Sequence, residues 1–140
     1  MAKFTHCAIA TAHISETLHF YCEICEMRLV RDRRQGFRIC WLAPKTTPAP
    51  ILVVIEHPEV PEASEGSDSM LRHFGFELES REAVDAMYEY LHSKEIPATK
   101  PFFVDEFTGY ITMAKDPDGR WVEFSHGQDV SESNWDLPQD

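Results

Sequence analysis

The chain has 140 residues, of which 43% are apolar and 26% charged, and its formal net charge at pH 7 is -11. The length suits one compact globular unit. The negative charge argues against nucleic acid and anionic membrane surfaces as partners, because phosphate binding needs clustered Lys and Arg. No segment approaches the roughly 20 apolar residues of a membrane span, and the N-terminal residues lack the apolar stretch of a secretory signal. We therefore expect a cytoplasmic protein.

In the first half of the chain, the pattern predicts a strand, a helix and three more strands. The first strand covers Thr5–Ala10, where side chains alternate between two faces. Ser15 is placed to cap the following helix, whose apolar side chains recur at helical spacing on one side. Three further strands are predicted at Arg28–Asp32, Phe37–Leu42 and Ile51–Glu56.

The second half repeats this order of elements. A strand at Arg72–Glu79 precedes a helix that Ser80 caps and that should end near Lys94, because Ile96 is followed by Pro97. Three strands follow, at Ala98–Phe102, Gly109–Ala114 and Trp121–Ser125. The sequence Asp116-Pro117-Asp118-Gly119 is typical of a hairpin turn between the last two strands, and we assign it no chemistry.

The two halves can be aligned with a shift of 67 residues (73 − 6). This shift places His6 on His73 and Glu56 on Glu123, and each histidine lies 50 residues before its glutamate (56 − 6 and 123 − 73). The same chemical pair at one shift indicates two copies of one β-rich module.

The repeat predicts how the domain is divided. We expect a single domain over 1–140, made of a first module at 4–58 and a second module at 71–126. The segment 59–70 is rich in Pro, Glu and Ser and is predicted to be a linker, and 127–140 a polar tail.

Strand alternation predicts that the two histidines and two glutamates lie on inner faces. Each lies opposite strongly apolar neighbours on its strand, and the small residues Ala8 and Gly75 stand beside the histidines. A ring of polar groups on an inner face needs partners, and a divalent cation would satisfy all four. Such a donor set suits zinc, nickel, cobalt or manganese, and iron less well. The predicted metal ligands are therefore His6, Glu56, His73 and Glu123.

Three short phrases carry a family resemblance: a leading strand with a histidine, the pair Phe20-Tyr21 in a helix, and Asp-Pro-Asp-Gly followed by Val122-Glu123-Phe124. Together, over His6 to about His126, they resemble the glyoxalase / bleomycin resistance protein / extradiol dioxygenase (vicinal oxygen chelate) superfamily. The resemblance implies an α+β fold in which two tandem βαβββ modules form a cup-shaped mixed sheet. The ring of His and Glu is most similar to that of glyoxalase I.

The resemblance implies a divalent-metal-dependent, glyoxalase-like lyase or isomerase, similar to lactoylglutathione lyase. Such an enzyme shifts a proton on a small 2-oxo or 2-hydroxy substrate through a metal-stabilised enediolate. Glu123 is predicted to be the base, with Glu56 as the symmetric alternative. Ala10 stands where glyoxalase I has an arginine for glutathione, and Val60 where it has an asparagine. These departures argue against glutathione as the thiol.

Two alternatives stay open. A metal-free binding protein of the bleomycin-resistance type would hold a cationic drug in an acidic cup, with aromatic rings for stacking. An extradiol-dioxygenase-like iron enzyme would use His6, His73 and Glu123 as ligands. Met113, however, stands where the dioxygenase motif has a tyrosine, and Tyr110, three residues away, faces the other side of its strand.

Weaker predictions concern substrate contacts and assembly. Arg38 is the candidate for binding an anionic substrate. Tyr110 and Trp121 are candidates for aromatic contacts with the small-molecule substrate. The resemblance also implies a homodimer, in which each metal site lies within one chain or is shared between two chains.

Overall fold

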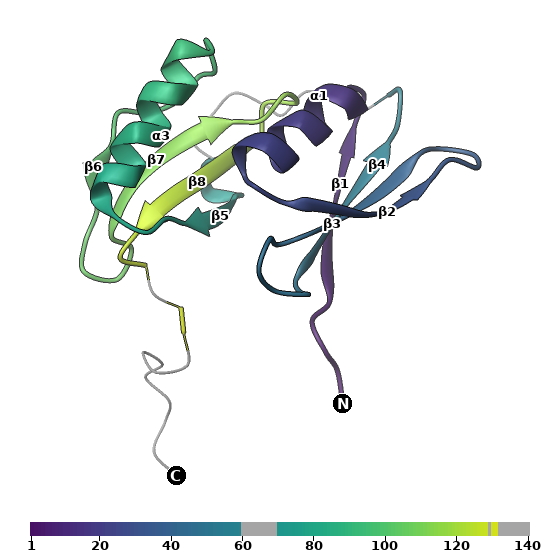
Figure 1. The fold of residues 1–140 in the computed structure, drawn as a ribbon, viewed down its shortest axis with the longest axis horizontal. Helices are drawn as coiled ribbons and strands as arrows, with labels where there is room; N and C mark the ends of the chain where they lie inside the picture. The colour runs from purple at the N-terminus through teal and green to yellow at the C-terminus, as the bar shows by residue number, and fades with distance from the viewer. Residues whose placement is uncertain (60–69, 129, 132–140) are drawn as a thin grey trace. The chain divides into compact units, whose positions relative to one another are not determined.

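The computed structural model describes residues 1–59, 70–128 and 130–131 (Figure 1). Most of the predicted linker and tail, and Val60, therefore lie outside the described residues. The chain divides into unit 1, made of residues 1–64 with 116–119, and unit 2, made of 65–115 with 120–140. Each unit contains one four-stranded sheet. In the described part of the chain, no helix is long and apolar enough to cross a membrane.

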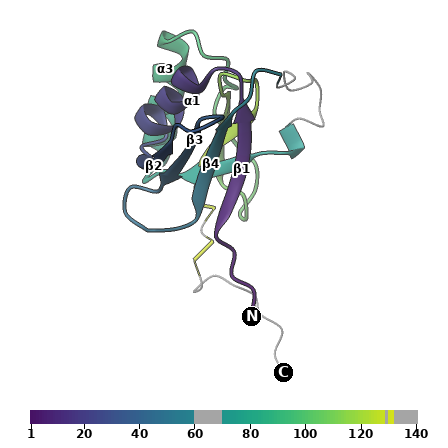
Figure 2. The same ribbon diagram turned by 90° about the vertical axis from the view of Figure 1, so that its right-hand side faces the viewer.

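Unit 1 has the predicted βαβββ order. Its elements are β1 (His6–Thr11), α1 (Ile14–His19), a π-helical continuation η1 (Phe20–Ile24), β2 (Arg28–Arg33), β3 (Ile39–Ala43) and β4 (Ile51–Glu56). The strands lie in the order β1-β4-β3-β2, where β1 and β4 are parallel and the other neighbours antiparallel (Figure 2). The predicted strands are thus confirmed to within a few residues at each end.

One face of the unit 1 sheet packs against the helix. Thr11 bonds Thr17 of α1 through their hydroxyls at 2.9 Å, and this places Thr11 on the helix side of β1. Strand partners point to the same side of a sheet, so Cys40 and its partner Val54 share a face and are both fully buried. The helix adds three buried side chains, Phe20, Tyr21 and Ile24. Burying a large apolar side chain contributes about 1.5–3 kcal/mol, so this face is the core of unit 1.

The N-cap of the first helix lies two residues earlier than the predicted Ser15, so the helix begins at Ile14. His13 is the N-cap residue, and no side chain caps the helix. The Thr11 hydroxyl instead accepts the His13 backbone N–H at 2.9 Å while it also bonds Thr17. The end of β1 therefore turns directly into the helix, and Ser15 lies within the first turn.

Unit 2 repeats the order with its own differences. Its elements are β5 (Phe74–Glu77), α3 (Arg81–Ser93), β6 (Phe102–Phe103), β7 (Tyr110–Lys115) and β8 (Trp121–His126), with the strand order β5-β8-β7-β6. The predicted cap is confirmed, because Ser80 Oγ accepts the Ala83 N–H at 3.0 Å, and Lys94 ends the helix. β6 is shorter than predicted: Ala98 makes only an isolated bridge. Pro101 has no N–H to donate to a ladder, which limits pairing before β6.

The hairpin turn at 116–119 is present and is buried. Asp116 accepts two backbone N–H groups, from Asp118 to its side chain and from Gly119 to its carbonyl, each at 2.9 Å. Asp116 and Asp118 are only 5% and 7% exposed. Tyr21 Oη donates to Asp116 Oδ2 at 2.7 Å, and Thr17 Oγ1 donates to Asp118 Oδ2 at 3.2 Å. The turn therefore supplies two buried carboxylates to unit 1, a role that its composition does not indicate.

Candidate metal centre

His73 and Glu123 lie on the same face of the unit 2 sheet. β5 and β8 are parallel, and Gly75 pairs with Glu123, so residues 73, 75 and 77 share the side of Glu123. The opposite side carries the fully buried residues Val122 and Phe124. It also carries Tyr110, whose hydroxyl bonds Asp85 of α3. The predicted alternation therefore holds in this unit, and we call the side of Glu123, away from α3, the open face.

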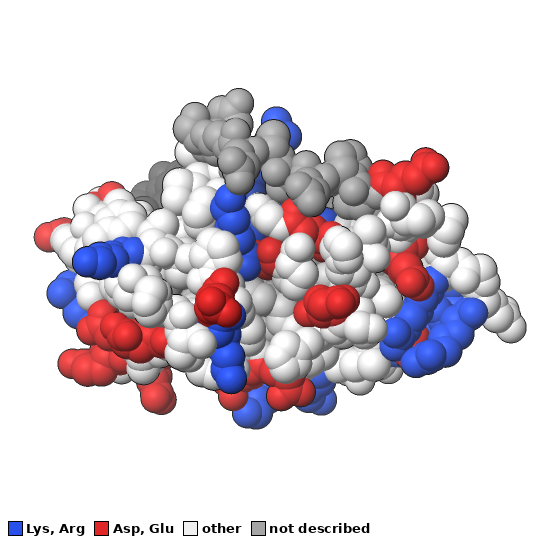
Figure 3. All heavy atoms as spheres, turned by 90° about the horizontal axis from the view of Figure 1, so that it is seen from above, with Lys and Arg blue, Asp and Glu red and all other residues white. Residues whose placement is uncertain are grey.

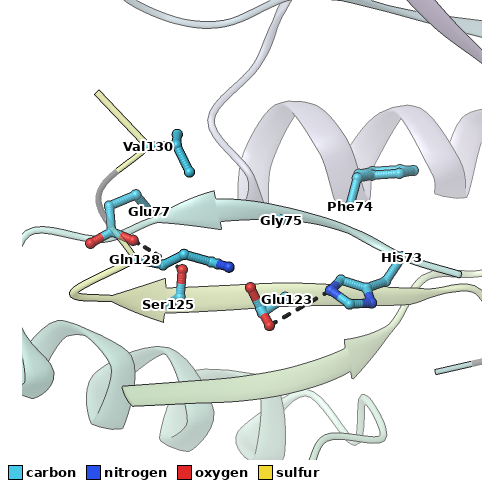
Figure 4. Close-up of a pocket in the computed structure, with 8 residues that line it drawn as sticks. All are labelled: His73, Phe74, Gly75, Glu77, Glu123, Ser125, Gln128 and Val130. Carbon is cyan, nitrogen blue, oxygen red and sulfur yellow. Dashed lines mark hydrogen bonds and ion pairs between the residues drawn. The ribbon is translucent and has the colours of Figure 1, made fainter. Parts of the chain in front are cut away.

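The imidazole and carboxylate meet on this open face. His73 Nε2 lies 3.6 Å from Glu123 Oε1 (Figure 4). Glu123 is only 4% exposed. Burial raises the pKa of Glu123, Glu77 adds to the rise, and His73 opposes it. Ionising this carboxylate is thus costly unless a positive charge stands beside it.

A backbone contact fixes the orientation of the His73 ring. Nδ1 lies 2.7 Å from the Met70 carbonyl oxygen, so Nδ1 carries the hydrogen and donates it. In the neutral ring, Nε2 then presents a lone pair toward Glu123. Two facing acceptors require a proton or a cation between them. Ligand atoms at tetrahedral zinc, with bonds of about 2.1 Å, lie about 3.4 Å apart, close to the separation found here. The pair therefore fits two ligands of one divalent ion.

Gly75 leaves space beside the carboxylate. An added Cβ would lie 3.2 Å from Glu123 Cβ and also 3.2 Å from Glu123 Oε2. Contacts this short would force the Glu123 side chain to move. A side chain at position 75 would therefore disturb the pair.

A hollow of about 270 Å³ opens over this pair (Figure 4). It has apolar walls as well as polar ones, which suits a small organic ligand. The other residues that line it are Phe74, Gly75, Glu77, Ser125, Gln128 and Val130.

Glu77 is a charged residue of this hollow to which the sequence alone assigned no role. Its carboxylate accepts a hydrogen bond from Ser125 Oγ at 3.0 Å and another from the Gly127 backbone N–H at 2.7 Å. Alternation from His73 placed Glu77 on this face, but the two hydrogen bonds that fix its carboxylate depend on the pairing of β5 with β8.

Contrary to the prediction from the sequence, unit 1 does not bring His6 and Glu56 together on one face. His6 pairs with Ile51 and Glu56 pairs with Thr11, so the two predicted ligands lie at opposite ends of the same ladder. Five residues of strand span about 16 Å. Because Thr11 faces α1, Glu56 also lies on the helix face, whereas His6 lies on the other one. The side chain that occupies the place of Glu123 in unit 1 is Val53, which pairs with Ala8.

The reason lies in strand register. β1 and β5 are related by the shift of 67, but β4 and β8 are related by 70 (121 − 51). An odd offset of three residues moves a side chain to the other face of its strand. In the described residues, 1–59, 70–128 and 130–131, no three His, Cys, Asp or Glu side chains gather as a metal-binding group. Within unit 2, His73 and Glu123 lie together as predicted ligands.

Two of the three predicted substrate contacts are engaged elsewhere. The Arg38 guanidinium binds Asp32 through two hydrogen bonds of 3.0 Å, which hold the pKa of Asp32 down at about 2. Tyr110 Oη donates to Asp85 Oδ1 at 2.6 Å on the α3 side of the sheet. Trp121 lies on the open face, with Lys115 Nζ 5.1 Å from its ring. Of the three, Trp121 alone shares the face of Glu123.

Known proteins resemble this chain over most of its length. The model of the Glyoxalase/Bleomycin resistance protein/Dioxygenase superfamily matches residues 3–124. The uncharacterized protein PA2024 of Pseudomonas aeruginosa is 31% identical over 139 residues, covering 96% of this chain and 95% of that protein. The chain therefore belongs to the Glyoxalase/Bleomycin resistance protein/Dioxygenase superfamily, and its paired βαβββ modules have that superfamily's fold.

Two solved structures share the fold at low sequence identity. The trypanothione-dependent glyoxalase I of Leishmania major has a TM-score of 0.66 and 16% identity, with 91% of this chain and 88% of that chain covered. TnmS3, an antibiotic binding protein of Streptomyces sp. CB03234, has a TM-score of 0.63 and 18% identity, with 90% and 96% covered. Both an enzyme and a binding protein are thus built on this fold.

Proposed function

We propose that the protein is a divalent-metal-dependent enzyme of the glyoxalase type, a lyase or isomerase that moves a proton on a small 2-oxo or 2-hydroxy substrate. The observation that carries the proposal is the pair on the open face of unit 2, in which His73 Nε2 and Glu123 Oε1 face each other at 3.6 Å. Membership of a superfamily that includes glyoxalases supports it.

His73 and Glu123 would hold the ion. The hydrogen bond from His73 Nδ1 to the Met70 carbonyl oxygen fixes the orientation of the ring. It leaves the lone pair of Nε2 available to bind the metal. A bound divalent ion would act as a Lewis acid that stabilises negative charge on the substrate oxygens. Zinc, nickel, cobalt and manganese suit the donor set. His6 remains a predicted third ligand.

Glu123 is also the proposed base. Burial raises its pKa, which makes the ionised carboxylate a stronger base than an exposed glutamate. In this role Glu123 removes the proton from the carbon that bears the hydroxyl and returns it to the neighbouring carbon. General acid–base catalysis of this kind contributes about 10²–10⁴-fold in rate. Glu56, the symmetric alternative, lies on the helix face of its sheet, and this favours Glu123.

Metal content is the first test. We expect the untagged wild-type protein, analysed by plasma mass spectrometry, to contain close to one zinc, nickel, cobalt or manganese ion per site. His73→Ala and Glu123→Ala should both lose it. Glu56→Ala is the matched control and should keep it, because that carboxylate points to the helix side. Methylglyoxal with a panel of thiols is then the first activity assay.

Absence of metal, even after reconstitution with each ion, would overturn the proposal. Iron that is lost in His73→Ala, Glu123→Ala and His6→Ala would favour the dioxygenase alternative. Met113 argues against that alternative, because it pairs with Glu123 where the dioxygenase motif has a tyrosine.

A metal-free binding protein is the second candidate. The carboxylates of Glu77 and Glu123 line the hollow, and TnmS3, which shares the fold, is described as an antibiotic binding protein. A binder of this kind would keep its ligand affinity after treatment with a chelator. The enzyme proposed above would lose substrate turnover under the same treatment.

A further inference from the structure

A second hollow adjoins the one over His73 and Glu123. Its volume is about 440 Å³, and it shares three lining residues with the first hollow: Glu77, Gln128 and Val130. Its other lining residues are Leu78, Glu79, His126 and Gly127. Glu77 therefore borders both the hollow over the candidate metal pair and the second hollow.

Glu77 stands at the junction with its carboxylate already oriented. Oε2 accepts from Ser125 Oγ at 3.0 Å, and Oε1 accepts from the Gly127 N–H at 2.7 Å. Figure 4 shows the Glu77 side chain next to Ser125, farther along the sheet than Glu123. A carboxylate oxygen can accept more than one hydrogen bond. Glu77 can therefore receive a further donor without losing the bonds that hold it.

The rest of the second hollow is rich in acceptors and poor in cations. His126 Nδ1 lies 2.9 Å from the Leu78 carbonyl oxygen and donates to it, so the neutral ring keeps Nε2 as an acceptor. Glu79 adds a second carboxylate, while Leu78 and Val130 supply apolar surface. Among the described residues that line either hollow, none is a lysine or an arginine. The carboxylates of the second hollow, Glu77 and Glu79, repel an anionic ligand group, and its one basic side chain among the described lining residues is His126, whose Nδ1 lies 3.7 Å from Glu77 Oε1.

We propose that Glu77 determines the charge of the ligand, by binding a primary ammonium or guanidinium group carried on a short apolar chain. The carbonyl end of the same ligand would then lie at His73 and Glu123, and that part rests on the proposed function. The substrate class that follows is an amine-bearing 2-oxo or 2-hydroxy compound, rather than an acid or a carboxylate-rich thiol conjugate.

The test uses three probes of equal chain length on the metal-free protein: n-butylammonium, n-butanol and n-butyrate. Binding is followed at pH 8 and low salt through the methyl NMR signals of Leu78 and Val130. We expect n-butylammonium to bind about fivefold or more tightly than n-butyrate, as for one partly exposed ion pair. Glu77→Gln should abolish this preference, and Glu77→Lys should reverse it.

Glu89→Gln is the control, because it removes the same charge from an exposed position of α3; it should leave the preference unchanged. Equal binding of the three probes, or a preference that survives Glu77→Gln, would overturn the role of Glu77. The metal analysis above is separate from this outcome. A wild-type protein without metal that still prefers n-butylammonium would remove the enzyme proposal and retain Glu77 as the charge-selecting residue.

Discussion

Two neighbours, Gly75 and His73, determine the position and the charge of the Glu123 carboxylate. Gly75 leaves the carboxylate its space, and His73 offers it either a proton or a shared cation. The sequence alone predicted this group, because alternation on two strands put all three residues on one side. It could not predict the separation of the two side chains, nor the Met70 carbonyl that orients the imidazole.

Replacing Gly75 by alanine tests how tightly the pair is built. The new Cβ would lie 3.2 Å from both Glu123 Oε2 and the Glu123 backbone oxygen, so the carboxylate must shift from its present position. We expect Gly75→Ala to weaken metal binding about 10- to 100-fold, as for the loss of other groups that support a ligand, measured by competition with a chromogenic chelator. Ala8→Gly, at the corresponding place in unit 1, should bind metal as the wild type does. Unchanged affinity in Gly75→Ala would show that Glu123 does not need its present position.

The pH dependence of stability tests the burial of Glu123. Because the folded pKa is raised, ionisation of Glu123 favours the unfolded chain. The protonated Glu123 carboxyl therefore contributes stability that is fully present below the unfolded pKa, near pH 4. This stability is lost as the pH rises through the folded pKa of Glu123. The free energy of unfolding of metal-free Glu123→Gln should therefore increase relative to wild type between about pH 4 and pH 8, as measured by urea denaturation. The same difference for Glu89→Gln should be flat. A flat difference for Glu123→Gln would contradict the raised pKa.

Elements were predicted better than their register. The strands and the cap at Ser80 follow from local patterns, and the structure confirms them except at β6, which covers only Phe102–Phe103. The place of Glu56 depends on which residues of β1 and β4 pair, and the sequence of either strand alone does not contain that information. The burial of the 116–119 turn depends in the same way on residues nearly 100 positions away.

That buried turn provides a test at the level of elements. Tyr21→Phe removes a hydroxyl that donates to the buried carboxylate of Asp116 at 2.7 Å. Loss of a hydrogen bond to a charged group costs about 1.5–3 kcal/mol, so the free energy of unfolding should fall by about that amount in urea denaturation. Tyr90→Phe, which makes the same change on the exposed side of α3, should stay within about 0.5 kcal/mol of wild type. Equal effects of the two substitutions would argue against the turn as a buried anchor.

For the whole molecule, the net charge supports an expectation about ligands and carries no information about the fold. Asp and Glu outnumber Lys and Arg by 24 to 13, and both kinds are interspersed on the face seen in Figure 3. A net charge of -11 suits ligands that carry positive charge or bring a cation with them. The superfamily fold was predicted from a few short sequence motifs rather than from the charge, and the family match confirms it.

The assembly state remains a prediction of the family resemblance. We expect a homodimer, which sedimentation equilibrium should detect as a species of 32.2 kDa (2 × 16.1 kDa). The mass should persist on dilution to low micromolar concentration if the dimer is stable. A species of 16.1 kDa throughout the concentration range would contradict this expectation.

The division of the chain also bears on how a repeated protein of this kind arises. Unit 1 includes residues 116–119, so it is completed by four residues that lie within the second copy of the repeat. A polypeptide ending in the linker would leave the hydroxyls of Tyr21 and Thr17 without the carboxylates that accept from them. The sequence repeat and the folding unit therefore do not coincide. A chain that contained one module alone would need a second chain to supply this turn, whereas two modules in one chain supply it as a loop between β7 and β8.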